Sequence, residues 1–357
     1  MKHQFQTIVE ENYNFGQIQG IRLSTVGDNS RSCIIQCKQG SNDAVYYCKQ
    51  HHPNKTEADL QSEHAFMCYF QARAQGKLES TVPVPTRQGQ EWVRAAFQGR
   101  EYYYAVYQCL SGKEPYSWWH NEVSENAFVS SSEAAAWFHS FSYGFESQKR
   151  EVSLDAQMEE WKKELQTWLP TMQGDRHRKL FYEYCTRNLD FLLQTLQWCK
   201  ERYRLTADQL PRCIIHGDLN PGNMKYDQDD HVCGIFDFDW VQKSIRLYDV
   251  AWMGHQMLSS WRPETFAELD LARYRRFLQL YNRTMQASGC PAGQLTRQEI
   301  NFLPVMTALI CVKIIRDLVS YLYLDPQDNT FEWLLGAWKH IKLIEFCKEH
   351  EEQFQIL

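Results

Sequence analysis

Residues 216–223 read His216-Gly217-Asp218-Leu219-Asn220-Pro221-Gly222-Asn223, and residues 235–239 read Ile235-Phe236-Asp237-Phe238-Asp239. Together they bring Asp218, Asn223 and Asp237 into a short part of the chain, next to turn-forming and apolar residues. Phosphoryl transfer requires such a set. One carboxylate orients the attacking hydroxyl, while an amide oxygen and a second carboxylate hold magnesium against the phosphates.

The spacing within these two motifs is specific. Kinase catalytic loops place four residues between an aspartate and an asparagine, and a D-F-G sequence follows later in the chain. Here the first motif is H-G-D-x-x-x-x-N and the second is D-F-D. A lone Asp-Phe-Asp would favour a solvated acidic turn, but the joint pattern argues for a catalytic site.

Short apolar runs precede both motifs. Residues 213–215 lead into the first motif, and residues 232–236 end at Asp237. Residues 226–230 between the runs are polar and predict a hairpin loop. We expect two paired strands that present the three polar residues from one edge.

The composition is that of an ordinary globular protein, with 43% hydrophobic and 23% charged residues. Its 357 residues suffice for one large domain or two lobes. The net charge of −6 argues against a nucleic-acid partner, and no apolar run is long enough to span a membrane. The N-terminus lacks the apolar core of a signal peptide, so we expect a cytoplasmic protein with reduced cysteines. The sequence gives no indication of the oligomeric state.

The N-terminal part is rich in strand patterns. Residues 32–37 and 44–49 predict a hairpin that carries Lys49 at its far end. A lysine at a strand end is usually a solvated charge, but a kinase requires a lysine on a strand to contact the ATP phosphates. His51-His52 follows in a polar segment, which predicts surface residues rather than a metal pair.

A helix is expected from Thr56 to Ala74, beginning with a Thr56–Asp59 capping box. Glu63 falls within the apolar stripe of this helix, and a carboxylate in such a stripe is costly unless it is paired. We therefore expect Glu63 to pair with Lys49. Glu57 is the competing candidate, although a helix-dipole role is sufficient to explain a carboxylate in the first turn.

A second hairpin, formed by residues 92–97 and 102–110, precedes a break at Ser111-Gly112-Lys113. The chain beyond this break is predominantly helical. We expect a nucleotide-binding lobe at residues 1–110, and a helical lobe with the catalytic loop and substrate site at residues 111–357. Helices are predicted at residues 131–141, 155–169, 177–204, 263–288, 296–324 and 331–353, and again from about residue 248.

The two motifs, with Tyr248-Asp249-Val250-Ala251 after them, resemble the aminoglycoside phosphotransferase and choline kinase superfamily. The resemblance extends over most of the chain. Residues 82–85 and 112 are similar to the hinge-proximal segment of that superfamily, and residues 134–139 to its first large-lobe helix. Residues 295–304 are similar to the C-terminal helices of its homoserine kinase and N-acetylhexosamine kinase branch.

The resemblance implies an α+β, bilobal, protein-kinase-like fold, with a small β-rich lobe and a larger, mainly helical lobe. It also implies ATP and Mg²⁺ as cofactors. Asp218 would be the catalytic base, Asn223 and Asp237 the magnesium ligands, and Lys49, positioned by Glu63, a contact to the ATP phosphates. Asp249 would be a buried acid that holds the catalytic loop.

The resemblance does not assign a single role to two further features, Asp239 and the loop at residues 25–30. Asp239 is either an outer-shell metal ligand or a substrate contact. The small-lobe loop at residues 25–30 has a single glycine, so backbone amides near Asn29 and Ser30 are the candidates for capping a phosphate.

The function expected from these residues is ATP- and Mg²⁺-dependent phosphorylation of a hydroxyl on a small metabolite. An amino sugar, an amino alcohol or a hydroxy amino acid would suit as acceptor. The alternatives are a catalytically silent kinase fold that serves as a binding or structural module, and a protein kinase. The catalytic positions argue against the first, and the short interval from Asp237 to Tyr248 leaves little room for an activation segment. Trp118, Trp119, Trp240 and Trp252 are candidates for stacking on a sugar, although core packing is the simpler role for each.

Overall fold

The computed structural model describes residues 2–24, 31–39, 42–74, 76–117, 121–147, 151–172, 178–324 and 330–355. By their contacts, the residues group into two compact units. Unit 1 comprises Met1–Lys113, Phe145–Lys149 and Met224–Asp239, and unit 2 comprises Glu114–Gly144, Arg150–Asn223 and Trp240–Leu357. The sequence analysis assigned residues 224–239 to the helical lobe, whereas their strand pairing groups them with unit 1.

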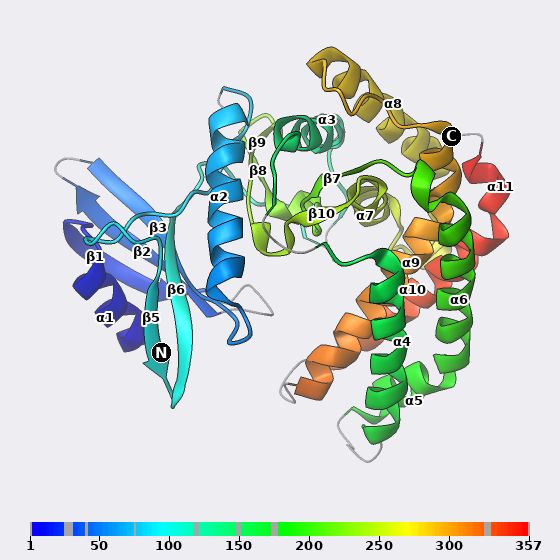
Figure 1. Cartoon of the computed structure of the whole chain (residues 1–357), viewed down its shortest axis with the longest axis horizontal. Helices are drawn as coiled ribbons and strands as arrows, with labels where there is room; N and C mark the ends of the chain where they lie inside the picture. Colours follow the sequence, from blue (N-terminus) through cyan, green and yellow to red (C-terminus); the bar gives the residue numbers. More distant parts are fainter. Residues whose placement is uncertain are drawn as a thin grey trace. The chain divides into compact units, whose positions relative to one another are not determined.

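The main sheet of unit 1 has five antiparallel strands (Figure 1). Their order is β1 (Gln17–Leu23), β2 (Arg31–Gln39), β3 (Asn42–Gln50), β6 (Arg100–Gln108) and β5 (Val93–Phe97). Both predicted hairpins are confirmed, because β2 pairs with β3 and β5 pairs with β6. Side chains alternate between the two faces of a strand, so each face can pack against a different helix.

One face of this sheet packs on α1 (Lys2–Asn12), a helix that the sequence analysis did not predict. Phe5, Ile8 and Val9 of α1 are buried against residues such as Tyr104 of β6. The rings of Phe5 and Tyr104 meet edge to face, with centroids 5.9 Å apart. The opposite face of β3 and β6 carries Lys49, Ala105 and Tyr107, and Tyr107 contacts the second helix.

That second helix is α2 (Glu57–Ala74), in good agreement with the predicted bounds. The capping box is confirmed. The backbone N–H of Thr56 donates to Oδ2 of Asp59 at 3.1 Å, and the backbone N–H of Asp59 donates to Oγ1 of Thr56 at 3.2 Å. The apolar stripe is buried as expected, and Glu63 within it is 2% exposed. Phe66 packs against Phe238, so α2 also contacts the segment that follows β9.

A small three-stranded sheet completes unit 1 in the order β4 (Glu79–Ser80), β9 (Val232–Ile235) and β8 (Met224–Tyr226). The antiparallel β8–β9 pair confirms a hairpin turn at residues 227–231. Gly112 approaches this hairpin closely, with φ +107°, and a Cβ there would lie 2.7 Å from the carbonyl oxygen of Tyr226. No other residue type fits at this position without displacing the hairpin.

The sequence analysis was wrong about one strand pairing. The strand before the catalytic loop, β7 (Arg212–Ile215), does not pair with β9 but with β10 (Gln242–Ile245), a strand that was not predicted. Short runs of this kind carry no information about their partner, since pairing depends on the register imposed by the fold.

Unit 2 is mainly helical. Its helices are α3 (Glu125–Ser142), α4 (Leu154–Thr171), α5 (Lys179–Arg187), α6 (Leu189–Thr206), α7 (Leu247–Leu258), α8 (Leu271–Ser288), α9 (Arg297–Leu324), α10 (Thr330–Glu349) and α11 (Glu351–Phe354). All the predicted helices are present. The predicted helix at 177–204 divides at Asn188, and the one at 263–288 begins only at Leu271. α9 contacts α4, α6, α7, α10 and α11 and forms the core of the unit (Figure 1).

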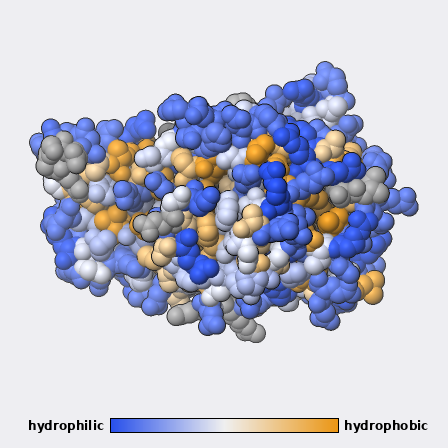
Figure 2. Space-filling view, turned by 90° about the horizontal axis from the view of Figure 1, so that it is seen from above, coloured by the Kyte–Doolittle hydropathy of each residue, from blue (hydrophilic) through white to orange (hydrophobic). Residues whose placement is uncertain are grey.

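The surface drawn in Figure 2 is largely hydrophilic, with apolar residues in separate patches. Within the described part of the chain, no helix is both long enough and apolar enough to cross a membrane.

Candidate active site

The catalytic loop begins with a turn at Gly217, whose φ is +81°. A Cβ at this position would lie 2.6 Å from the carbonyl oxygen of Trp240, so the close approach of these two backbones requires glycine. Trp240 ends the short 3₁₀ helix η3 (Phe238–Trp240) and directly precedes the segment that leads into β10. Within unit 2, the residue that follows the second motif thus lies against the start of the first motif.

Two amide side chains orient Asp218. Nδ2 of Asn220 donates to Oδ1 of Asp218 at 3.0 Å, and Nδ2 of Asn223 donates to Oδ2 at 2.8 Å. Both amides also donate to the backbone carbonyl of Asp218. Because the two donors fix both carboxylate oxygens, the plane of the carboxylate is set by the loop itself.

Asp249, in the first turn of α7, holds the start of the loop through its backbone N–H groups. Its carboxylate accepts the backbone N–H of His216 at 2.6 Å and the backbone N–H of Gly217 at 2.9 Å. It also lies 3.2 Å from Nε2 of His139, whose other ring nitrogen is 2.7 Å from the hydroxyl of Tyr281. Asp249 is fully buried. Its expected role as a buried acid tying the loop to the following helix is confirmed.

In unit 1, Asp237 follows β9 with a backbone φ of +63°. This left-handed conformation is uncommon for a residue other than glycine, and such strain is concentrated at functional sites. The side chain is 42% exposed, and its Oδ1 lies 3.2 Å from Nζ of Lys49. The carboxylate is therefore accessible to a ligand while its backbone is held by the surrounding fold.

Lys49 and Asp239 form the closer pair, with Nζ 2.6 Å from Oδ2. Burial lowers the pKa of Lys49, but Asp237 and Asp239 outweigh it, so the pKa lies well above its ordinary value. Burial raises the pKa of Asp239, but Lys49 and Lys55 outweigh this effect and hold it well below its ordinary value. Both partners of this pair are consequently charged near neutral pH.

The expected Lys49–Glu63 pair is wrong. Glu63 is paired instead with Lys55, whose Nζ lies 2.5 Å from Oε2 of Glu63. Lys49 is already held by two carboxylates, whereas Lys55 enters from the turn that precedes α2 and reaches the buried face of the helix. Burial raises the pKa of Glu63 to about 7, with Asp239 adding to the effect and Lys55 opposing it.

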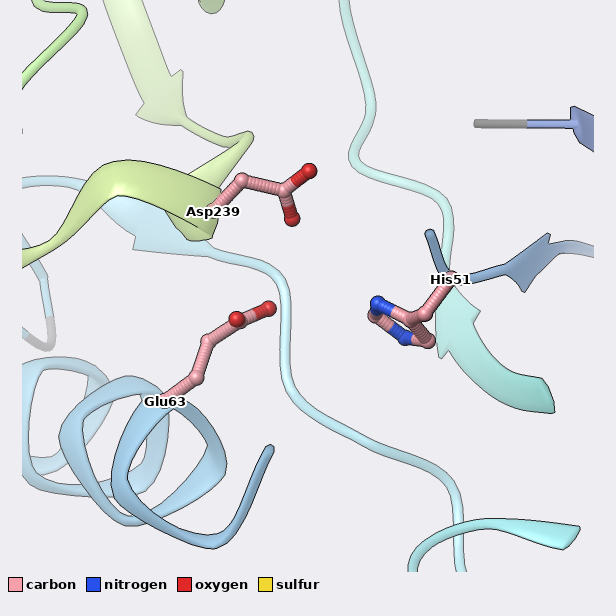
Figure 3. Close-up of side chains that lie close together, drawn as sticks. All are labelled: His51, Glu63 and Asp239. Atoms are coloured by element: carbon pink, nitrogen blue, oxygen red, sulfur yellow. The ribbon is translucent and has the colours of Figure 1, made fainter. Parts of the chain in front are cut away.

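His51, Glu63 and Asp239 meet on the side of β3 that faces α2, and Figure 3 shows the two carboxylates and the imidazole turned toward one another. One ligand atom from each lies within 4.8 Å of the others. His51 is 2% exposed, so its predicted surface position is wrong; its Nε2 lies 3.1 Å from the hydroxyl of Tyr107. Lys49 and Lys55 already neutralise Asp239 and Glu63, so this cluster is an ion-pair network rather than a metal centre.

Asn223 and Asp237, the magnesium ligands expected from the sequence, belong to different units, and each carries an oxygen that could serve as a ligand. Mg²⁺ prefers oxygen ligands and takes only one or two carboxylates from the protein. Asn223 turns its amide nitrogen toward Asp218, which leaves its oxygen as the ligand atom. Asp237 offers a partly exposed carboxylate. The donor set is of the type that a hard cation requires.

Some expected residues lie outside the described part of the chain, namely Asn29, Ser30, Trp118 and Trp119. Of the other two tryptophans, Trp252 is 7% exposed and serves the core, whereas Trp240 is 46% exposed.

The sequence analysis missed Lys55, Asn220 and His139. Asn220 was recognisable as a polar residue inside the catalytic motif, two positions from Asp218. His139 was visible only as part of an apolar helix, and Lys55 only as a cation beside a helix cap. Neither signal identifies a partner that is distant along the chain.

A family model described as the phosphotransferase enzyme family matches residues 36–286. The chain belongs to this family. The match includes β3, α2, both motifs and Asp249. A homoserine kinase of Bradyrhizobium sp. (strain ORS 278) is 31% identical over 103 residues, which are 29% of this chain and 28% of that kinase. The similarity therefore spans little more than a quarter of the length of that relative.

Solved structures of several kinases share the fold. An amicoumacin kinase has a TM-score of 0.64 at 16% identity, covering 99% of this chain and 96% of the other. A microcompartment-associated aminopropanol kinase gives 0.63 at 14% identity, with 99% of each chain covered. A spectinomycin phosphotransferase gives 0.62 at 9% identity, with 98% and 99% covered. These likenesses confirm the predicted α+β fold of the protein-kinase type.

Proposed function

We propose that this family member is a kinase that transfers the γ-phosphoryl group of ATP to a hydroxyl of a small metabolite. The observation that carries the proposal is the geometry of Asp218, whose two oxygens are held by Asn220 and Asn223 in a loop anchored on a buried acid. A merely solvated acidic turn has no need of such fixation. The amicoumacin kinase and the spectinomycin phosphotransferase were solved with AMP-PNP and ADP respectively, which supports a nucleotide as donor.

Asp218 accepts the proton of the acceptor hydroxyl as its oxygen attacks the γ-phosphorus. The bond between the γ-phosphorus and the bridging oxygen breaks, and ADP leaves with that oxygen. Positioning and electrostatics account for most of the rate in such transfers, so a carboxylate of fixed orientation is the central requirement.

Asn223 and Asp237 would hold Mg²⁺, which would supply positive charge to neutralise the phosphates. When ATP binds, Lys49 donates a hydrogen bond to a phosphate oxygen in place of one of its hydrogen bonds to Asp237 and Asp239. Lys55 holds Glu63 and keeps the cluster electrically balanced during this exchange. Backbone amides near Asn29 and Ser30 are proposed to cap a phosphate. The proposed reaction therefore uses Asp218 and Asn223 of unit 2 and Lys49 and Asp237 of unit 1.

A catalytically silent binding protein is the alternative function. A screen of ATP consumption against hydroxylated metabolites separates the two, with Asp218→Asn as the blank. Consumption that requires both an acceptor and Asp218 supports the kinase. ATP binding without acceptor-dependent turnover across the screen would favour the silent fold.

A further inference from the structure

α9 is a core helix with one polar interruption. From Phe302 to Leu322 its residues are buried, except for Lys313, Arg316, Asp317 and Tyr321. These four positions follow helical spacing and share one face. We call Lys313, Arg316 and Asp317 the polar window of α9. Their side chains are 16% to 22% exposed, so this face of α9 is only partly buried, and charges there need partners.

The charges of the window are paired in a defined way. Nζ of Lys313 lies 2.6 Å from Oδ2 of Asp317, and Nη1 of Arg316 lies 2.7 Å from Oδ1. Nε of Arg316 donates to Glu164 of α4 at 2.6 Å. Both oxygens of Asp317 are thus engaged, and Arg316 is shared between two carboxylates. Lys313 has three N–H donors, of which one is used on a carboxylate of the described chain.

Two tryptophans surround the ammonium of Lys313. Its Nζ lies 5.2 Å from the ring centre of Trp240 and 5.3 Å from that of Trp252. Trp252 stacks on Tyr248 with centroids 5.8 Å apart. An aromatic site of this kind attracts a cation, but here the cation is supplied by the protein itself. Lys313 already occupies the site between the two tryptophans, so it would repel the ammonium group of an acceptor.

The window lies near the catalytic loop within unit 2. Burial raises the pKa of Tyr248, and Asp317, Asp249 and Asp218 raise it further, so Asp317 of the window and Asp218 of the loop both act on this hydroxyl. The backbone of Trp240 also lies against Gly217, the residue before Asp218. A small molecule with one end at Lys313 would therefore have its other end in the neighbourhood of Asp218.

We infer that Lys313 binds an anionic group, a carboxylate, of the phosphate acceptor. The acceptor is then a small hydroxy acid or hydroxy amino acid rather than an amino sugar or amino alcohol. This inference rests on the proposed function and narrows it. A carboxylate would use the remaining N–H donors of Lys313. An ammonium group would find no unpaired carboxylate among these residues, because Asp317 is paired with Lys313 and Arg316, and Glu164 is paired with Arg316.

The test uses matched acceptors that differ by one group. Homoserine has a hydroxyl, an amine and a carboxylate; 4-hydroxybutyrate lacks the amine; 3-aminopropan-1-ol lacks the carboxylate. Turnover is measured for the full chain with Mg–ATP, and acceptor binding by calorimetry with a non-hydrolysable ATP analogue. Equivalent sets, each with a hydroxy amino acid, the hydroxy acid that lacks its amine and the amino alcohol that lacks its carboxylate, are made for chains of three to six carbons. The variants are Lys313→Met, the charge-preserving Lys313→Arg, and Lys342→Met, at an exposed position of α10, as the matched control.

We expect carboxylate acceptors to bind and the corresponding amino alcohols to bind at least tenfold more weakly. Lys313→Met should raise the KM of the carboxylate acceptor roughly ten- to a hundredfold, because a charge-assisted hydrogen bond is lost. The nucleotide KM should not change, Lys313→Arg should retain most of the affinity, and Lys342→Met should match the wild type.

Three results would overturn the inference. The first is a preference for the amino alcohol, and the second is carboxylate binding that Lys313→Met leaves unchanged. The third is that no carboxylate acceptor binds in any of the sets. Failure of the proposed function has a different signature: carboxylates would bind in a Lys313-dependent manner, but ATP would not be consumed with any acceptor.

Discussion

Lys49 donates to Asp239 across 2.6 Å, a shorter contact than the 3.2 Å to the metal-ligand candidate Asp237. The lysine is 6% exposed, so its charge depends on these two carboxylates. We therefore propose that Asp239 positions Lys49, the lysine proposed to contact the phosphates, which adds a third role to the two considered from the sequence.

Asp239→Asn should raise the nucleotide KM about tenfold and leave the acceptor KM nearly unchanged, because it releases Lys49 from its closest anchor. Steady-state kinetics with each substrate varied in turn provide the measurement. An increase confined to the acceptor KM would instead make Asp239 a substrate contact.

Asp218→Asn should lower turnover by roughly 10²–10⁴, the usual effect of removing a positioned general base. Nucleotide binding should persist, because Asp218 has no proposed contact with the nucleotide. Asp208→Asn, at an exposed position of the same unit, is the matched control. Near-normal turnover of Asp218→Asn on the true acceptor would remove this residue from catalysis.

Asp237→Ala should abolish the magnesium dependence of nucleotide affinity, since it removes an oxygen ligand of the proposed metal site. Calorimetric titration of an ATP analogue with and without Mg²⁺ measures this directly. A variant that still binds the nucleotide more tightly with Mg²⁺ would show that the metal is held elsewhere.

Asp249→Asn should destabilise unit 2 by about 2–4 kcal/mol, because an amide nitrogen would then face buried N–H donors of His216 and Gly217. Urea denaturation reports the loss of stability. Turnover should also fall, since the loop that carries Asp218 loses its anchor. Unchanged stability would mean that the loop is held by its local turns alone.

Lys339 of α10 provides a prediction about pH. It is 2% exposed, and burial lowers its pKa to about 7. Between this value and its ordinary pKa of 10.5, the unfolded chain binds more protons than the folded chain, so stability increases as pH rises through that window.

Relative to Lys339→Met, the wild type should therefore gain stability from about pH 7 to about pH 10, by up to a few kcal/mol at about 1.4 kcal/mol per pKa unit. Urea denaturation of both proteins at several pH values isolates this residue from the other groups that titrate. A constant difference across the range would mean that Lys339 keeps its ordinary pKa in the folded state.

Much of the fold could be predicted because its signals are local. The hairpins β2–β3 and β5–β6 follow from alternating runs joined by turn residues, and α2 follows from its capping box and apolar stripe. The break at Asn188 and the late start of α8 at Leu271 were missed, since the same periodicity continues through both points.

The motifs also determined the chemistry of the loop. The spacing from Asp218 to Asn223 fits one tight turn, in which the amide reaches back to the carboxylate, and the hydrogen bonds that hold both oxygens of Asp218 are made within six residues. Local contacts of this kind are encoded directly by the order of the residues.

Partners that are distant along the chain were decided only by the tertiary structure. Glu63 was recognisable as a buried acid in need of a cation, but Lys49 and Lys55 both satisfied that condition, and the choice depended on where Asp237 and Asp239 lay. The same holds for β7, which pairs with β10, and for Lys313, whose tryptophans come from other segments. The sequence by itself determined which residues carry charge and which turns they occupy. Only the packed chain decided which charges meet, because the energy of an ion pair depends on separation in space rather than along the sequence.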